Sequence, residues 1–279
     1  MVAFSFWWVS VYWYGIFYVI GFLVAYWFLN FVARKKYFSD YSRLQFVLEK
    51  KLDDFLLVCV AGVLIWGRLG DVLIYNFAYF LAHPIKIFAV WEGGMSFVWW
   101  GIWVVLAVWF FQYWYQFSRD EKWLLYDLMT AIVPFGVLIG RIWNFLNQEL
   151  YGLTVQQIGL HSERLITFLQ TIWVFHIYPQ VDSLLRVNTN FLASFFEGFV
   201  LLILMQLIFW KKLVYQKINF WVLAACWLFC YSFFRFFLEY LRYDSSLEFF
   251  GWFSKSQYFM IFFMIFSVVV VSRRIKKKK

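Results

Sequence analysis

Residues 128–152 read "LMTAIVPFGVLIGRIWNFLNQELYG", an uncharged apolar run that passes directly into polar and charged side chains. The first half, residues 128–140, has the composition of a helix that lies in lipid. The second half supplies four polar residues in quick succession: Arg141, Asn144, Asn147 and Glu149. Ionisable groups close to hydrocarbon are costly, so they mark candidate functional sites. The stretch therefore predicts a membrane helix that carries a functional site at its end.

The rest of the chain is equally apolar. Of its 279 residues, 64% are hydrophobic and 15% are charged, against about 45–50% and about 25% in soluble proteins. A spanning helix needs about 20 apolar residues. We therefore expect an all-α, polytopic membrane protein with about seven transmembrane helices. They are placed near residues 9–32, 55–74, 93–115, 123–143, 193–211, 218–239 and 256–272.

The basic residues predict the orientation of these helices. Of the 25 Lys and Arg residues, 17 fall in four segments that seven helices place on one side of the membrane. The segments hold Arg34, Lys35, Lys36, Arg43, Lys50 and Lys51; Arg119 and Lys122; Lys211, Lys212 and Lys217; and Arg273, Arg274 and residues 276–279. Basic loops remain in the cytoplasm, so we expect a cytoplasmic C-terminus and an external N-terminus. Such loops face anionic lipid heads, which explains the net charge of +9 without a nucleic-acid partner.

Cysteine and histidine usage predicts no metal site, redox pair or disulfide framework. Cys59, Cys226 and Cys230 lie inside apolar segments without metal-ligand spacing, which is typical of packing residues. The three histidines are scattered, which argues against a transition-metal cluster. The N-terminus "MVAFSFWW" lacks the basic region of a cleaved signal, so we expect the first helix to be retained. We expect one integral-membrane domain over residues 1–279, with a small external arm or cap at about 150–190 between the fourth and fifth helices.

Two predicted helices bring arginines together at the external side, and a third approaches the same side. The fourth ends near Arg141, with Asn144 on the same face one turn later. The sixth carries a polar stripe at helical spacing, which consists of Tyr231, Arg235, Glu239 and Arg242. The second approaches the same side with Arg68 and Asp71, next to a loop "WEGGMSF" whose Gly93 and Gly94 permit close backbone approach to a ligand.

Phosphate is the ligand that this chemistry favours. A guanidinium group binds phosphate through two parallel hydrogen bonds and stays charged at any relevant pH. At the outer surface of the bilayer the abundant phosphates belong to lipids, so Arg141 and Arg235 indicate a phospholipid head-group site. The alternative is a structural network, in which Arg235 pairs with Glu239 and Arg141 binds a helix C-terminal carbonyl.

The residues of this site also resemble a known family. "GRIWNFLNQELYG" (140–152) resembles the signature "GRxGNFxNxExxG" of the prolipoprotein diacylglyceryl transferases. Further matching blocks follow in the family order over nearly the whole chain. They are "WYGIFYVIGF" (13–22), "GRLGDVLIYNF" (67–77), "HPIKIFAVWEGGMSF" (83–97), "RVNTNFLASFFEG" (186–198), "FRFFLEYLR" (234–242) and "SKSQ" (254–257). The family's seven-helix arrangement with an external N-terminus agrees with the topology predicted from charge.

The resemblance implies a bacterial enzyme of the cytoplasmic membrane. It implies transfer of the diacylglyceryl group from phosphatidylglycerol to the lipobox cysteine of prolipoproteins, which forms a thioether and releases glycerol phosphate. The implied partners are phosphatidylglycerol, lipobox-containing prolipoproteins and membrane lipid, and no cofactor or metal is implied. Two alternatives stay open: a degenerate relative that binds phospholipid or precursor without transfer, and a membrane transporter. The clustering of polar residues at one depth argues against the transporter.

The resemblance also implies roles for individual residues. The implied catalytic residues are Arg141, Arg235, Glu239 and Asn144. The implied substrate-binding residues are Tyr14, Gly93, Gly94, Ser96, Arg141, Asn144, Glu149, Gly152 and Arg235. In this scheme the two arginines bind the phosphate, Glu239 holds Arg235, and Tyr14 and Asn144 orient the head group, while the glycines shape the backbone.

Three departures from the family pattern limit this scheme. Val98 stands where many relatives carry His or Tyr, so Glu149, Asp71 and the substrate phosphate remain alternative bases. Residues 187–193 lack the family's polar residues, which leaves Arg186 and Glu197 as candidates in that block. Tryptophan replaces glycine at five positions: Trp66, Trp99, Trp100, Trp103 and Trp143. We hypothesise that some of these come from a codon that the organism reads as glycine.

Overall fold

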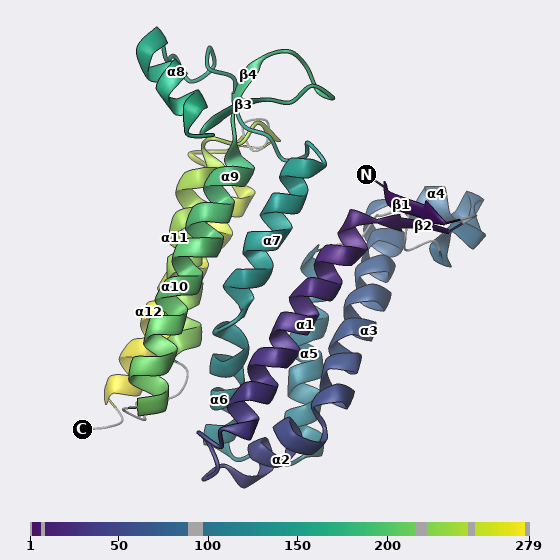
Figure 1. Ribbon diagram of the computed structural model, residues 1–279, viewed down its shortest axis with the longest axis vertical. Coiled ribbons are helices and arrows are strands. Elements are labelled where there is room, and N and C mark those ends of the chain that lie inside the picture. Colours follow the sequence, from purple (N-terminus) through teal and green to yellow (C-terminus); the bar gives the residue numbers. More distant parts are fainter. Residues whose placement is uncertain (1, 7–8, 89–96, 216–221, 245–248, 277–279) are drawn as a thin grey trace. The chain divides into compact units, whose positions relative to one another are not determined.

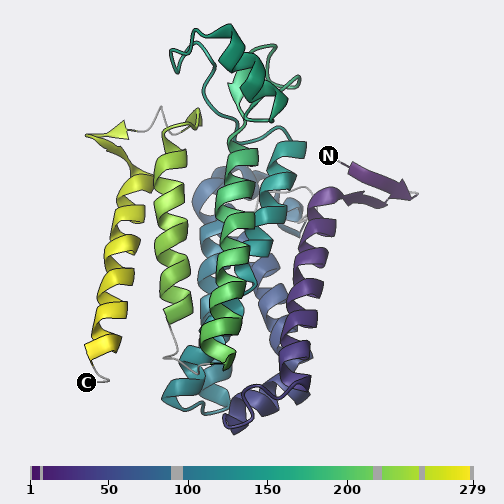
Figure 2. The ribbon, with the colours of Figure 1, turned by 60° about the vertical axis from the view of Figure 1, so that its left-hand side comes forward.

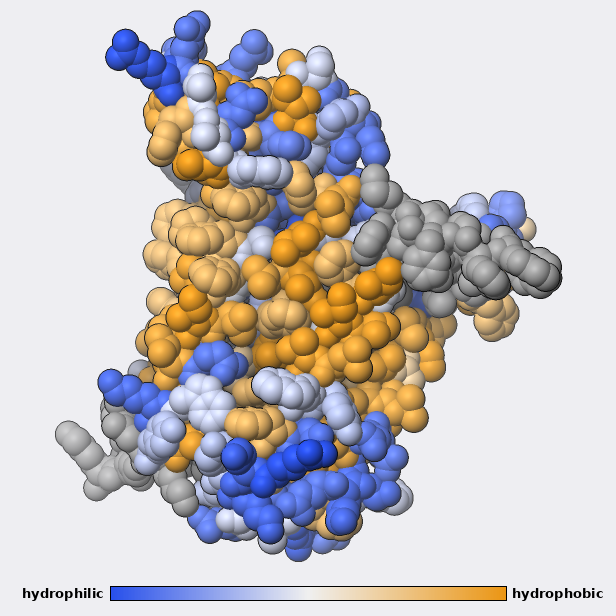
Figure 3. All heavy atoms as spheres, viewed as in Figure 1, coloured by the Kyte–Doolittle hydropathy of each residue, from blue (hydrophilic) through white to orange (hydrophobic). Residues whose placement is uncertain are grey.

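The computed structural model describes residues 2–6, 9–88, 97–215, 222–244 and 249–276 (Figure 1). Six of the described helices are long and apolar enough to cross a membrane, which makes this a multi-pass membrane protein. Hydrophobic side chains gather over the middle of the helices and hydrophilic ones at their ends (Figure 3). The chain divides into two compact units, Val2–Leu125 and Tyr126–Lys279.

The Val2–Leu125 unit begins with a hairpin. Strands β1 (Val2–Phe6) and β2 (Val9–Tyr12) pair in antiparallel fashion, and helix α1 (Trp13–Arg34) follows directly. The first membrane helix, predicted near residues 9–32, therefore begins only at Trp13. Residues 9–12 read "VSVY", and this alternation of β-branched or aromatic residues with a small polar one favours a strand over the first turn of a helix.

The remaining elements of this unit follow α1 in a simple order. They are α2 (Ser42–Lys50), α3 (Leu52–Gly70), the π-helical turn η1 (Asp71–Tyr75), α4 (Phe77–Ala82), the 3₁₀ turn η2 (Pro84–Phe88), α5 (Phe97–Trp114) and most of α6 (Arg119–Thr130). The carboxylate of Glu121 in α6 accepts hydrogen bonds from the backbone of Arg43 (2.9 Å) and Leu44 (3.1 Å). It thereby satisfies free N–H groups at the start of α2.

Helices α3 and α5 pack through a tryptophan. The Trp103 ring stacks on Trp66 at 5.1 Å, and its Nε1 donates to the carbonyl of Val58 (3.3 Å). A Cβ at Gly62 would lie 1.2 Å from Trp103 Nε1, so the indole crowds the glycine backbone.

The Tyr126–Lys279 unit holds the remaining long helices, which lie side by side (Figure 2). Helix α7 (Val133–Leu146) leads into a small folded segment, residues 147–188, which we call the arm. A continuous helix follows, made of α9 (Thr189–Ala193), the π-helical η4 (Ser194–Val200), α10 (Leu201–Ile208) and the π-helical η5 (Phe209–Tyr215). Helix α11 (Val222–Glu239), the short strands β5 (Phe249–Phe250) and β6 (Phe253–Ser254), and α12 (Lys255–Lys276) complete the unit.

The arm contains helix α8 (Glu163–Thr171) and the antiparallel strands β3 (Phe175–Ile177) and β4 (Leu185–Val187). Aromatic rings pack against one another in the arm. Phe145 at the end of α7 contacts His176 (4.9 Å) and Tyr178 (6.0 Å), and Trp173 stacks on His176 at 5.6 Å. Burial lowers the pKa of His176, because a charged imidazole loses its hydration there.

The observed helices differ from the predicted spans at two further places. The predicted span 93–115 corresponds to α5, of which Trp103–Trp114 is a shorter apolar helix, so the count of seven spans stays a prediction, as does the external N-terminus. The predicted span 123–143 consists of α6 and α7, with a break at Ala131 and Ile132. Pro134 explains the break, since it lacks a backbone N–H donor and its ring crowds the preceding turn.

Candidate functional site

Arg141 lies on α7 and points toward η4. Its Nη2 is 3.1 Å from Oε2 of Glu197. The two helices approach closely at Gly198, where a Cβ would lie 2.7 Å from the α-carbon of Leu138. The hydroxyl of Ser194 donates to the Leu138 carbonyl (3.2 Å). Small residues permit this approach, and it brings the Glu197 carboxylate to the arginine one turn beyond Leu138.

Helix α11 supplies the second arginine. Nη1 of Arg235 lies 3.9 Å from Oε1 of Glu197, and its Nη2 lies 2.6 Å from Oε2 of Glu239. The i, i+4 pair predicted for Arg235 and Glu239 is thus confirmed. Arg141 and Arg235 share one carboxylate, so their guanidinium groups are neighbours, as the prediction of converging arginines requires.

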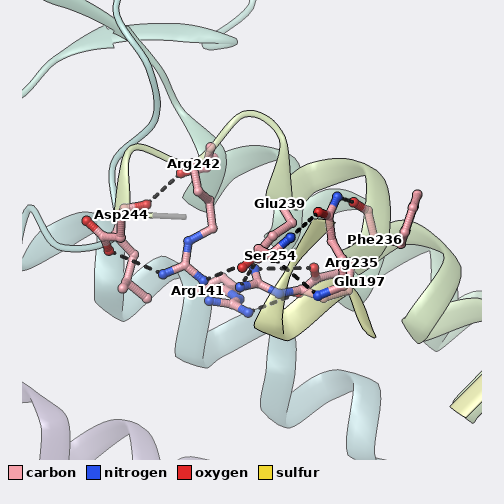
Figure 4. A network of polar contacts seen from close by, with 11 residues as sticks. Arg141, Glu197, Arg235, Phe236, Glu239, Arg242, Asp244 and Ser254 are labelled. Atoms are coloured by element: carbon pink, nitrogen blue, oxygen red, sulfur yellow. Dashed lines mark hydrogen bonds and ion pairs between the residues drawn. The ribbon is translucent and has the colours of Figure 1, made fainter. Parts of the chain in front are cut away.

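A third arginine extends the cluster past the end of α11. Nη1 of Arg242 lies 3.8 Å from Oε2 of Glu239, and its Nη2 lies 3.4 Å from Oδ2 of Asp244. Figure 4 shows these guanidinium groups and carboxylates drawn together in one network. We call Arg141, Glu197, Arg235, Glu239, Arg242 and Asp244 the arginine cluster.

Burial differs sharply within the arginine cluster. The side chain of Glu197 is 0% exposed and that of Glu239 is 6% exposed, whereas that of Asp244 is 53% exposed. The pKa of Arg242 is lowered, first by burial and then by the positive charge of Arg235, while Glu239 opposes the shift. Three guanidinium groups and three carboxylates balance in the cluster, and Asp244 is the most exposed of these carboxylates.

Tyr231 adds a hydroxyl to the cluster. It lies one helical turn before Arg235 on α11 and its side chain interacts with Arg141. Of the polar stripe predicted on the sixth helix, Tyr231, Arg235 and Glu239 lie on α11, whereas Arg242 follows the end of that helix.

Asn144 and Glu149 form a separate polar group at the end of α7. Nδ2 of Asn144 donates to Glu149 Oε2 (3.5 Å), and Nδ2 of Asn147 donates to Oε1 (2.6 Å). Gln148 and Leu150 adopt left-handed backbone conformations, with φ of 56° and 52°. This tight turn folds Glu149 back toward α7, so the Asn144 side chain turns to Glu149 and not to Arg141.

The altered block 187–193 fixes that turn from the other side. The side chain of Asn190 donates to the carbonyl of Glu149 (2.6 Å), and that of Thr189 donates to the carbonyl of Leu150 (2.6 Å). Asn188 accepts from the backbone N–H of Phe191 (3.0 Å) and so caps α9. These residues have structural roles in the described structure.

Gly152 joins the arm to the arginine cluster. It forms an antiparallel bridge with Arg242, and its N–H donates to the carbonyl of Val187 (3.0 Å). A Cβ at this position would lie 2.6 Å from the Val187 carbonyl oxygen and 2.7 Å from that of Leu241. The glycine allows three backbone segments to meet, and the bridge holds the backbone of Arg242.

Arg186 contacts several residues of the same junction and holds them together. Its guanidinium lies between the rings of Tyr151 (4.9 Å) and Tyr243 (5.1 Å), pairs with Asp182 (2.5 Å) and donates to the carbonyl of Gly152 (3.2 Å). The hydrogen bond to Asp182 raises the pKa of Arg186, and Arg186 lowers the pKa of Asp182. Arg186 thus appears among the structural contacts of the arm, not among those of the arginine cluster.

The other predicted site residues belong to the Val2–Leu125 unit. Tyr14 lies in the first turn of α1, while its side chain and the whole of Gly93, Gly94 and Ser96 lie outside the described residues. The backbone of Val98 is in α5.

Arg68 and Asp71 hold a loop in that unit. Nη1 of Arg68 lies 3.8 Å from Oδ2 of Asp71, and Arg68 donates to the carbonyls of Lys86 (2.5 Å) and Ile87 (3.0 Å). Asn76 donates to Asp71 (2.9 Å). Asp71 therefore already serves as partner to two side chains.

Sequence reasoning placed Glu197 only as a weak candidate, and it did not foresee Asp244. The pair Glu197-Gly198 is the sequence signal that could have identified Glu197. A glycine next to an acidic residue within an apolar helix indicates close packing beside a buried charge. Within the described ranges, no three His, Cys, Asp or Glu side chains gather as a metal site would need.

Comparisons with known proteins agree with the sequence resemblance. A family model described as prolipoprotein diacylglyceryl transferase matches residues 1–273. Three similar curated proteins are each called phosphatidylglycerol–prolipoprotein diacylglyceryl transferase. That of Wolbachia pipientis subsp. Culex pipiens is 32% identical over 86% of this chain and 81% of the relative. That of Aeromonas salmonicida is 34% identical over 88% of this chain and 78% of the relative. That of Photobacterium profundum is 32% identical over 94% of this chain and 88% of the relative.

Proposed function

The chain belongs to the prolipoprotein diacylglyceryl transferase family, and on that premise we propose that it transfers diacylglycerol from phosphatidylglycerol to the lipobox cysteine of prolipoproteins. The cysteine sulfur forms a bond to the terminal glyceryl carbon of the diacylglyceryl group. The bond between that carbon and the phosphate oxygen breaks, and its electron pair leaves with glycerol phosphate. The proposed location is the outer face of the cytoplasmic membrane.

The observation that carries this proposal is the shared carboxylate of Glu197. It brings Arg141 and Arg235 together, with Oε2 at 3.1 Å from one and Oε1 at 3.9 Å from the other. When the C–O bond breaks, the phosphate gains a second negative charge. Preorganised guanidinium groups stabilise that developing charge most strongly where water is largely excluded.

The carboxylates of the cluster have positioning roles in this scheme. Glu197 is fully buried and contacts the guanidinium groups of both Arg141 and Arg235, so its carboxylate holds the two arginines beside each other. Glu239 holds Arg235 at 2.6 Å and also lies 3.8 Å from Arg242. Each keeps an arginine in place without contact to the reacting sulfur.

The thiol of the lipobox cysteine has an ordinary pKa of about 8.5, so a base or a cationic field must favour its thiolate. In this scheme the guanidinium groups of Arg141, Arg235 and Arg242 supply the cationic field. Glu149, Asp71 and the substrate phosphate remain the alternative proton acceptors. Of these, Glu149 is exposed at the end of α7, in the same unit as the cluster.

One assay tests the proposal. Purified protein is incubated with phosphatidylglycerol and a lipobox peptide, and the diacylglyceryl thioether is measured by mass spectrometry. We expect product from the native chain and a loss of at least about 100-fold in Arg141→Ala and Arg235→Ala. Arg34→Ala is the matched control, since Arg34 is exposed at the end of α1 and donates a hydrogen bond to Asn30 in the same helix (3.1 Å).

A second candidate function is lipid binding without transfer. Val98, in the place where many relatives carry His or Tyr, is the observation that favours it. In the same assay this candidate predicts saturable binding of phosphatidylglycerol and no thioether at any peptide concentration, which would contradict the transferase proposal.

A further inference from the structure

Asp244 differs from the other carboxylates of the arginine cluster. Its side chain is 53% exposed, whereas those of Glu197 and Glu239 are 0% and 6% exposed. Its contact with Arg242 is also long, at 3.4 Å. Exposed ion pairs are weak because water screens both charges. Asp244 is therefore the partner that an incoming anion replaces most easily.

The balance of charges in the arginine cluster also indicates that Asp244 is the replaceable partner. Three guanidinium groups, those of Arg141, Arg235 and Arg242, face two buried carboxylates, those of Glu197 and Glu239. This arrangement has a surplus of one positive charge, which Asp244 neutralises from the solvent side. A lipid phosphodiester also carries a single negative charge, so it matches the surplus that remains when Asp244 turns away.

An incoming anion cannot replace Glu239 at Arg242 as easily as it replaces Asp244. Its Oε2 serves both Arg235 (2.6 Å) and Arg242 (3.8 Å) from within the helix end. Displacing it would leave a buried carboxylate without compensation, which is costly. Arg242 thus has one fixed partner and one exposed partner.

Building on the proposed function, we propose that Asp244 is an exchangeable counter-ion that occupies Arg242 in the lipid-free protein and competes with the phosphodiester of the incoming phospholipid. Asp244 thereby sets the affinity for anionic head groups without contact to the reacting atoms. Removal of its charge strengthens lipid binding, and the rate of the bound complex does not change.

The test compares Asp244→Asn with the native chain. We expect the KM for phosphatidylglycerol to fall about two- to fivefold, as for one solvent-screened charge, with kcat unchanged. Asp244→Glu keeps the competing charge and is expected to retain the native KM. The matched control is Asp54→Asn, because Asp54 is 57% exposed, forms an ion pair with Lys51 (2.9 Å) and changes net charge equally. Its KM is expected to remain native.

A binding measurement separates this inference from the proposed function. Native mass spectrometry of the purified protein without peptide compares phosphatidylglycerol with diacylglycerol, which has the same acyl chains and no phosphate. We expect Asp244→Asn to retain more phosphatidylglycerol than the native chain and the same amount of diacylglycerol. This result supports the inference even where no thioether forms. An unchanged or weaker retention of phosphatidylglycerol in a variant with native thermal stability would overturn it.

Discussion

Arg141 on α7 and Glu197 on η4 are 56 residues apart in the chain, yet their side chains form a hydrogen-bonded ion pair between the two helices. Nη2 of Arg141 lies 3.1 Å from Oε2 of Glu197. The pair depends on the close approach of α7 and η4 at Gly198. It also depends on a π-helical segment, Ser194–Val200, which carries Glu197. Such segments are rare and occur often at functional sites.

Glu197→Ala tests the importance of this shared carboxylate. Breaking a buried ion pair leaves uncompensated charge, so the free energy of unfolding is expected to fall by about 3–5 kcal/mol, measured by denaturation in mixed micelles. Glu197→Gln keeps the shape and is expected to lose less stability but most of the transferase activity. Glu163→Ala at the exposed start of α8 is the control, with a change within about 0.5 kcal/mol. Native stability in Glu197→Ala would show that the carboxylate does not hold the two arginines.

Gly152→Ala tests the junction between the arm and Arg242. A methyl group would collide with the carbonyl oxygens of Val187 and Leu241, at 2.6 and 2.7 Å, so we expect a loss of about 1–3 kcal/mol from overpacking together with reduced activity. The control is Gly136→Ala in α7, where a Cβ would meet nothing within 4 Å. That change is expected to stabilise the helix by about 0.5–1 kcal/mol. Full activity in Gly152→Ala would mean that the bridge does not position Arg242.

The arm should loosen in acid because of Asp182. Arg186 lowers the pKa of Asp182 in the folded protein, so the pair contributes stability above the ordinary aspartate pKa of about 3.9 and loses it as pH falls through the lowered value. Limited proteolysis across pH 2–7 measures this. We expect cleavage in the arm to rise at the acid end for the native chain, and Asp182→Asn to be cleaved readily even at pH 7. A pH profile of native cleavage that Asp182→Asn leaves unchanged would contradict the assignment.

Trp103 is the position that best tests the hypothesis of a misread glycine codon. Its indole crowds the backbone of Gly62, because Nε1 lies 1.2 Å from the place of a Cβ. Loss of a well-packed core tryptophan costs about 3–5 kcal/mol, but here we expect Trp103→Gly to retain or increase stability. Peptide mass spectrometry of the protein from its native host is expected to find glycine at residue 103. Tryptophan there, together with a large loss of stability in Trp103→Gly, would end the hypothesis.

Sequence reasoning predicted the parts of the site that depend on helical spacing. Arg235 and Glu239 are four residues apart in one helix, so their pairing follows from local geometry. The convergence of Arg141 and Arg235 followed from placing both helix ends at one membrane depth. The contacts of Arg186 and of Asp244 depend on how the arm and the residues after α11 fold. The spacing of residues along the sequence does not predict that folding.

The contact of Asn144 was missed for a similar reason. Its place on the face of Arg141 follows from the helical repeat, but the left-handed residues Gln148 and Leu150 turn the chain so that Glu149 meets Asn144 first. Neither residue is a glycine, so the sequence carried no signal for that turn. The strand at residues 9–12 was absorbed into a predicted helix, because hydropathy alone does not separate an apolar strand from the start of an apolar helix.

The central claim is that Arg141 and Arg235 bind one and the same lipid phosphate, and a double-mutant cycle on kcat/KM for phosphatidylglycerol tests it most directly. Two groups that act on one phosphate are coupled, so the loss in Arg141→Ala/Arg235→Ala is expected to be clearly smaller than the product of the two single losses. Independent losses that multiply within error would contradict the claim, because they would mean that the two guanidinium groups act at separate places.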